Sequence, residues 1–244
     1  MIPYFAVGAA SVASRILAGR NALISFAWIG STFIPAASVA RLAKSCLSVV
    51  LDSGAFTAWS QGKPVELARY AAYVQEHHVL FDWCASLDAI GDAAQSRRNW
   101  LALRAAVPTA KIVPVFHEGE EPALLDEYVS AAPLVGLGRI EGRRSIDATF
   151  AWYDAVFNRH PEGRFHGFGN SAPETLEPYP FHSFDSSTWE RDSAYGAKHR
   201  FPWSRCSKET RMRAYLEALA TIEHRPQGRQ LLLPTGDDSD VRLT

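Results

Sequence analysis

Four side chains that can do acid–base or nucleophilic chemistry each stand at the end of an apolar stretch. Asp52 follows Val49–Leu51, and Asp88, His117 and Asp185 end similar stretches further along the chain. Two carboxylates across one pocket suit displacement at the anomeric carbon of a sugar, because one can attack that carbon while the other handles protons. A third carboxylate and an imidazole suit recognition of a planar base, since a carboxylate accepts hydrogen bonds from amide-like N–H groups and amines.

Small and aromatic residues accompany these side chains. An aromatic ring can offer a stacking face to a base, and glycine lets the backbone lie close to a ring edge. Taken singly, each feature has a plainer explanation: an aspartate after a strand often caps the next helix, a histidine can be a satisfied semi-buried residue, and a glycine can be a turn residue. Their joint occurrence at strand ends favours a functional site, with candidate binding residues Ser53, Phe56, Asp88, His117, Gly138, Arg139, Gly167 and Gly169.

The elements that must position these residues alternate along the chain. Apolar runs without internal polar alternation are typical of parallel strands covered on both faces. Such runs predict strands at Pro3–Val7, Ala22–Ile29, Ser48–Asp52, Phe81–Asp88, Lys111–His117, Leu134–Ile140, Arg164–Gly169 and Phe181–Asp185. Amphipathic segments predict helices at Pro64–His78, Ala93–Val107 (with Trp100, Leu101 and Leu103 inward), Glu121–Ala131, Ser145–Asn158 and Lys208–His224, and one helical turn in Ser171–Tyr179.

The predicted fold is α/β, a single-domain (β/α)8 TIM barrel over residues 1–225. Eight strands alternating with helices match this architecture, as does a length of 244 residues. A doubly wound open sheet is the alternative, because it shows the same alternation. In a barrel the carboxyl ends of all strands meet at one mouth, so the candidate residues should converge there. Residues 226–244 are expected to form a polar C-terminal tail, much of it disordered.

Composition narrows the class of protein. The chain carries 25 Lys and Arg against 26 Asp and Glu, so no strong global field favours polyanions. Residues 190–229 are mildly basic, with nine Lys and Arg against five Asp and Glu, which alone is typical of a solvated helical face. The three cysteines are far apart and predict neither a disulfide framework nor a zinc site, which suits the cytoplasm. The N-terminus lacks a basic start and is interpreted as a strand and helix, and no apolar run is long enough to span a membrane.

Several segments, taken in order, resemble the tRNA-guanine transglycosylase family. The stretch "LDSGAFTAW" resembles the family's DSGGF/Y signature, and "PFHSFDSSTW" resembles the segment whose FD supplies the nucleophile. Between them "SLDAIGD", "VPVFHEGE", "VGLGRI" and "RFHGFG" follow in the family's order. The matched segments span residues 48–189 and look most like the compact phage and bacterial relatives, some of which insert 7-deazaguanines into DNA.

The resemblance implies a role for each matched residue. Asp185 would attack C1′ of a nucleotide, expel its base and form a covalent glycosyl-enzyme. Asp52 would be the general acid/base near the exchanged base, and Phe56 would stack on that base. Asp88 would accept hydrogen bonds from the purine amine and ring N–H. The neighbourhood of Gly138 would offer backbone donors to the base carbonyl.

The chain also departs from the tRNA enzymes. His117 stands where those enzymes usually carry Gln, so base recognition there is expected to differ. Their Cys/His zinc site is reduced here to His199 and Cys206, so we expect no zinc and no other cofactor. The chain is shorter and has no appended RNA-binding domain, which favours DNA over tRNA. The residues that would approach nucleic-acid phosphates are Arg191, Lys198, Arg200 and Arg205.

The leading hypothesis is therefore a pentosyltransferase that replaces guanine by a 7-deazaguanine of the preQ0 type in nucleic acid, DNA before tRNA. Its expected partners are the nucleic acid, the 7-deazapurine base and accessory DNA-modification proteins, with no membrane. A hydrolase or glycosyltransferase acting on free nucleosides or small glycosides is a second interpretation. A catalytically inactive barrel that binds a base or nucleic acid is a third.

Overall fold

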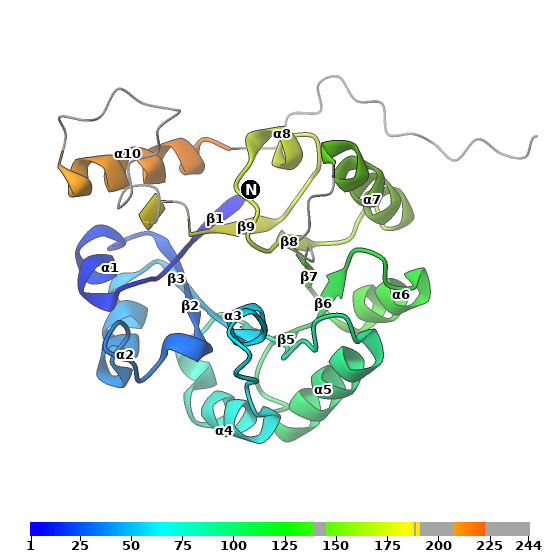
Figure 1. Ribbon diagram of the computed structural model, residues 1–244, viewed down its shortest axis with the longest axis horizontal. Coiled ribbons are helices and arrows are strands. Elements are labelled where there is room, and N and C mark those ends of the chain that lie inside the picture. Colours follow the sequence, from blue (N-terminus) through cyan, green and yellow to red (C-terminus); the bar gives the residue numbers. More distant parts are fainter. Residues whose placement is uncertain (139–144, 188, 191–206, 223–244) are drawn as a thin grey trace, which may run out of the picture.

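The computed structural model describes residues 1–138, 145–187, 189–190 and 207–222. Its strands form a ring of parallel strands surrounded by helices, which is the predicted TIM barrel (Figure 1). All strand pairs are parallel. The strands are β1 (Ile2–Ala6), β2 (Asn21–Ser25), β3 (Ser48–Asp52), β4 (Cys84–Ala85), β5 (Ile112–Val113), β6 (Val115–His117), β7 (Val135–Gly138), β8 (Phe165–Gly167) and β9 (Ser183–Ser186).

The two end strands of the ring, β5 and β6, are joined by a single proline. The strand order is β5-β4-β3-β2-β1-β9-β8-β7-β6, so β5 and β6 are the two ends, and only Pro114 separates them in the chain. Proline has no N–H to donate to a neighbouring strand, which interrupts the ladder at this residue. Its carbonyl still accepts a hydrogen bond from the Gly136 N–H at 2.8 Å. Because β5 pairs with β4 and β6 pairs with β7, the two short strands share one position in the ring.

Helices follow most strands and cover the outside of the ring (Figure 1). Three of them begin at a side-chain cap: Asp92 accepts from the Gln95 N–H at 2.8 Å, Ser145 from Ala148, and Ser207 from Thr210. The helices are α1 (Ala10–Ile16), η1 (Phe26–Trp28), α2 (Ala36–Ser45), α3 (Ala55–Ser60), α4 (Leu67–His77), η2 (His78–Leu80), α5 (Ala93–Ala106), α6 (Pro122–Ala131), α7 (Ile146–Arg159), α8 (Pro173–Leu176) and α10 (Lys208–Ala220). No helix in these ranges has the length and apolar character needed to cross a bilayer.

The core has two layers because each strand buries both faces. In β3, Val49 and Leu51 belong to the large cluster between strands and helices, whereas Val50 belongs to a smaller cluster inside the barrel. This alternation follows from the two-residue period of a strand. The inner cluster, which closes the barrel interior, consists of Tyr4, Leu23, Val50, Trp83, Ala85, Val113 and Leu134.

The structure corrects several predicted boundaries. The strand predicted at Ala22–Ile29 ends at Ser25, and a 3-10 turn follows it. The strand predicted at 81–88 is paired only at Cys84–Ala85. Leu101 was predicted to point inward but is 37% exposed, because the buried face of α5 is set by Trp100 and Leu103, and the next residue along a helix lies about 100° around the axis. The 226–244 tail lies outside the described residues.

Candidate active site

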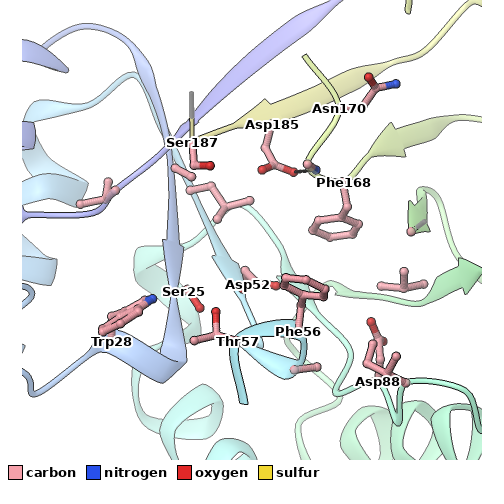
Figure 2. Close-up of a pocket in the computed structure, with 18 of the residues that line it drawn as sticks. Ser25, Trp28, Asp52, Phe56, Thr57, Asp88, Phe168, Asn170, Asp185 and Ser187 are labelled. Carbon is pink, nitrogen blue, oxygen red and sulfur yellow. Dashed lines mark hydrogen bonds between the residues drawn. The ribbon is translucent and has the colours of Figure 1, made fainter. Parts of the chain in front are cut away.

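One large cavity opens at the carboxyl ends of the strands. Its volume is about 960 Å³, within the range of small-molecule sites. Asp52, Asp88 and Asp185 all line it: Asp52 from the end of β3, Asp185 from β9 and Asp88 from the segment that follows β4 (Figure 2). The predicted convergence of the three carboxylates is therefore confirmed.

Of the remaining candidate residues, some face the cavity and others do not. Phe56, His117, Gly138 and Gly169 line it together with the three aspartates. Ser53 is buried and its hydroxyl accepts from the Ala55 N–H, outside the cavity lining. A side chain at Gly167 would meet Phe181, so this glycine serves packing between β8 and the following segment. Ser53 and Gly167 are therefore absent from the cavity lining and their binding roles stay predictions, while Arg139, Arg191, Lys198, Arg200 and Arg205 lie outside the described residues.

Asp185 is held by two donors on one oxygen. The Gly169 N–H donates to Oδ1 at 2.8 Å, the contact dashed at Asp185 in Figure 2. His166 Nε2 lies 3.3 Å from the same atom. The second ring nitrogen of His166 lies 2.8 Å from the Ser183 hydroxyl. Asp185 is 7% exposed, so its orientation is fixed by neighbours, while its second oxygen, Oδ2, accepts no hydrogen bond from the residues that the structure describes. Oδ2 is the oxygen free to react.

A Ser–His–Asp row is formed by Ser183, His166 and Asp185, but its order of burial is the reverse of that in a catalytic triad. In a hydrolase relay the hydroxyl faces the substrate and the carboxylate is buried. Here Ser183 and His166 are both fully buried and Asp185 lines the cavity. Ser183 is thereby excluded as a nucleophile toward a ligand in the cavity, and His166 lies between Ser183 and Asp185, where it helps to fix the Asp185 carboxyl group. Sequence reasoning missed His166, because its relation to Ser183 comes from the register between β8 and β9.

Asp52 sits in a tight turn at the end of β3. Its Oδ2 accepts from the Gly54 N–H at 3.0 Å. Burial raises the pKa of Asp52 to about 6, the Ser25 hydroxyl opposes the shift and the charge of Asp185 adds to it. Gly54 has φ of +77°, and a Cβ there would lie 2.5 Å from the Cβ of Ala27. Packing of α3 against η1 therefore requires this glycine, which is a different reason from the close approach of a ligand.

Asp88, His117 and Glu120 form a buried row on one wall. His117 Nε2 lies 3.6 Å from Asp88 Oδ2, and Nδ1 lies 3.4 Å from Glu120 Oε1. Burial lowers the pKa of His117, but the Glu120 hydrogen bond and the Asp88 charge outweigh it and raise that pKa above its ordinary value. Burial also raises the pKa of Asp88 to about 7, opposed first by His117. The 3.6 Å separation makes His117 an ion-pair partner of Asp88, while Oδ1 of Asp88 accepts a hydrogen bond from the Ser86 hydroxyl at 3.2 Å. These two neighbours hold the Asp88 carboxyl group at the cavity wall.

Aromatic and glycine residues shape the remaining walls. Phe56, from α3, and Phe168, which follows β8, both line the cavity and are labelled in Figure 2. Phe168 was missed from the sequence, since a phenylalanine between glycines carries no signal of its own. A Cβ at Gly138 would lie 2.8 Å from two atoms of the His117 ring, so the missing side chain makes room for the imidazole.

Comparisons with known proteins bear on the fold. No protein-family model and no curated protein matches the chain. A putative fructose-1,6-biphosphate aldolase from Coccidioides immitis matches with a TM-score of 0.59 and 12% identity, over 91% of this chain and 90% of that one. The tryptophan synthase A-subunit from Pyrococcus furiosus matches with a TM-score of 0.59 and 11% identity, over 90% and 97%. OMP decarboxylase from Leishmania donovani matches with a TM-score of 0.52 and 12% identity, over 90% and 92%. At these identities the likeness shows that the chain has the TIM-barrel fold, and the transglycosylase resemblance stays a prediction.

Proposed function

We propose that the protein is a pentosyltransferase that exchanges a nucleobase on a nucleic acid, replacing guanine by a 7-deazaguanine. The observation that carries the proposal is the pair of carboxyl groups in one cavity: Asp185 with one oxygen fixed and one free, and Asp52 with a pKa raised to about 6. A buried carboxyl group with a raised pKa that shares a cavity with a second carboxyl group is a common arrangement of a general acid/base and a nucleophile. The barrel fold is shared with enzymes, and the family resemblance of the sequence supports the substrate class.

The reaction balances with the residues present. Oδ2 of Asp185 attacks C1′ while the bond from C1′ to the base nitrogen breaks and its electrons leave with the base. Asp52 in its protonated form gives that base a proton, which lowers the barrier because the bare base is a poor anion. The incoming base then loses a proton to Asp52 and attacks C1′, and the bond to Asp185 breaks. Two displacements at one carbon retain its configuration.

Base recognition is assigned to the wall of the cavity that carries Asp88 and His117. Asp88, oriented by His117, accepts hydrogen bonds from the amine and ring N–H of a guanine-like base. Phe56 and Phe168 supply the aromatic faces, and stacking on an aromatic ring stabilises a base that has left its own stack. These four residues bring donors, acceptors and ring faces together around a planar ligand.

The covalent step provides the direct test. The protein is incubated with single-stranded DNA or with tRNA, and with a labelled 7-deazaguanine base. Incorporation into DNA, and a protein–nucleic acid adduct on denaturing gels that disappears in Asp185→Asn, is the expected result. An undiminished adduct in Asp185→Asn excludes this residue as nucleophile. Incorporation into tRNA alone refutes DNA as the substrate.

A second candidate is base release or exchange on free nucleosides. The cavity volume of about 960 Å³ favours it, since that space holds a whole nucleoside without any polymer contact. Turnover of free nucleosides, together with no binding to nucleic acid at low salt, decides for this alternative.

A further inference from the structure

An aromatic surface leads from the cavity to the outside of the barrel. Trp28, at the end of η1, lines the cavity (Figure 2). The ring of Phe33 lies 5.9 Å from that of Trp28, edge to face, and Phe33 is 55% exposed. An exposed phenylalanine one ring beyond the cavity wall has an open face to offer to a second planar group.

The loop that carries this pair is held rigidly. The Ser31 hydroxyl donates to the Trp28 carbonyl at 2.6 Å and accepts from the Phe33 and Ile34 N–H groups. The Phe33 carbonyl accepts from the Ala10 N–H at 2.8 Å, which fastens the loop to the start of α1. The position of Phe33 relative to Trp28 is therefore set before any ligand arrives, which lowers the entropy lost on binding.

A second, smaller cavity is lined in part by Phe33. Its volume is about 140 Å³, and Phe33 and Arg41 both line it. Four hydroxyl side chains complete its polar lining, from α1, the loop and α2: Ser11, Ser14, Thr32 and Ser38. Arg41 is exposed and makes no ion pair within residues 1–138 or the other described segments. A free guanidinium among hydroxyl donors is the chemistry that receives a phosphate.

We propose that Phe33 and Arg41 form a subsite for the nucleotide next to the reacting one in an unpaired nucleic-acid strand. The base of that neighbour stacks on Phe33, and its phosphodiester lies in the small cavity against Arg41 and the hydroxyl groups. This inference rests on the proposed exchange reaction, because the large cavity must hold the reacting nucleotide. Continuity through Trp28 favours a strand over a separate phosphorylated ligand, since one polymer then occupies both cavities.

Binding to oligonucleotides tests the subsite directly. The full chain and its Phe33→Ala, Phe33→Trp and Arg41→Gln variants are titrated with a fluorescent single-stranded oligodeoxynucleotide and its RNA counterpart at several salt concentrations. Phe33→Ala should weaken binding roughly 5-fold or more, as expected for loss of one stacked base, and Phe33→Trp should restore it. Arg41→Gln should weaken binding and reduce the salt slope by about 0.7, the value for one phosphate contact on a single strand.

Lys44→Gln is the matched control, because Lys44 is an exposed cation on the same helix outside the small cavity. Equal weakening in Lys44→Gln and Arg41→Gln overturns the subsite, since diffuse charge then explains the binding. Comparison of the DNA and RNA arms shows which polymer the subsite accepts.

Base exchange separates this inference from the proposed function. Exchange of labelled guanine into a free nucleoside should be unchanged in Phe33→Ala and Arg41→Gln, while exchange into the oligonucleotide should fall. Unchanged exchange into the oligonucleotide overturns the subsite and leaves the proposed function standing. Absence of exchange on every substrate, with oligonucleotide binding that still depends on Phe33 and Arg41, refutes the proposed function and leaves the subsite standing.

Discussion

Replacing His166 by methionine tests whether the buried imidazole positions Asp185. Methionine is flexible enough to fill the space between the rings of Trp83 and Phe168, whose centroids lie 5.0 Å and 4.6 Å from that of His166. It removes the donor 3.3 Å from Asp185 Oδ1 and leaves the Gly169 N–H as the remaining donor to that oxygen. The carboxylate then keeps its place at the end of β9 but loses part of its fixed orientation.

The size of the effect follows from the hydrogen bond. A bond to a charged group contributes roughly 1.5–3 kcal/mol. The 3.3 Å separation is at the long end for an N–H donor, so about 1.5 kcal/mol is the appropriate estimate. If that energy is lost in the transition state, kcat falls roughly tenfold. KM should change little, because His166 is fully buried and outside the cavity lining.

Stability and catalysis must be separated in this experiment. His166→Met also leaves the buried Ser183 hydroxyl without its imidazole partner, which costs roughly 1–3 kcal/mol of folding free energy. The double variant His166→Met with Ser183→Ala removes both polar groups and should recover much of that stability while kcat stays low. His166→Gln keeps a donor and should recover part of kcat. Single-turnover adduct formation measures the chemical step, and a double variant with wild-type kcat would refute the positioning role.

Three further predictions concern the turn at Asp52 and the carboxylate beside His117. The pKa of Asp52 is raised from 3.8 to about 6 on folding, so the native state binds more protons and loses stability as pH rises from about 4 to 6. Asp52→Asn should therefore have a higher melting temperature than wild type at pH 8 but not at pH 4, and it should abolish exchange. A difference in melting temperature that does not depend on pH contradicts the shift. Gly54→Ala should lose roughly 1–3 kcal/mol in chemical denaturation, because of its positive φ and the collision with Ala27, and an unaltered midpoint rules out that strain. Glu120→Gln should lower the pKa of His117 in an NMR titration and raise KM for the incoming base, and a fixed His117 pKa excludes the coupling.

The sequence predicted the parts of the fold that depend on local pattern. Val49–Leu51 reads as a buried strand and delivers Asp52 at its end, and the structure has this strand with the predicted bounds. The short helix α3, which carries Phe56, was not predicted, because six residues give too little periodicity. Closure of the ring could not be separated from an open sheet, since it depends on how the segments either side of Pro114 pair with strands far along the chain.

In the site too, residues set by local sequence pattern could be predicted, and residues set by contacts between distant segments could not. Asp52, Asp88 and Asp185 could be placed because each ends a strand predicted from the sequence, and parallel strands end at one mouth. His166 and Glu120 could not, because their importance lies in contacts across strand pairs and within a turn: His166 reaches Ser183 on the neighbouring strand, and Glu120 folds back onto His117. Side-chain partnerships of this kind appear only when register and loop geometry are known.

The steric relation between Gly138 and His117 has a consequence for changing the specificity of the site. The two residues act as one unit, because any side chain at 138 would enter the space of the imidazole at 2.8 Å. Substitutions at the two positions should therefore be strongly epistatic: Gly138→Ala is harmful beside His117 and tolerated beside a smaller residue. A paired library at both positions should yield functional variants along a diagonal in which total side-chain volume is conserved. A change in which base the cavity accepts therefore requires simultaneous substitution of His117 and Gly138, with the total side-chain volume kept constant.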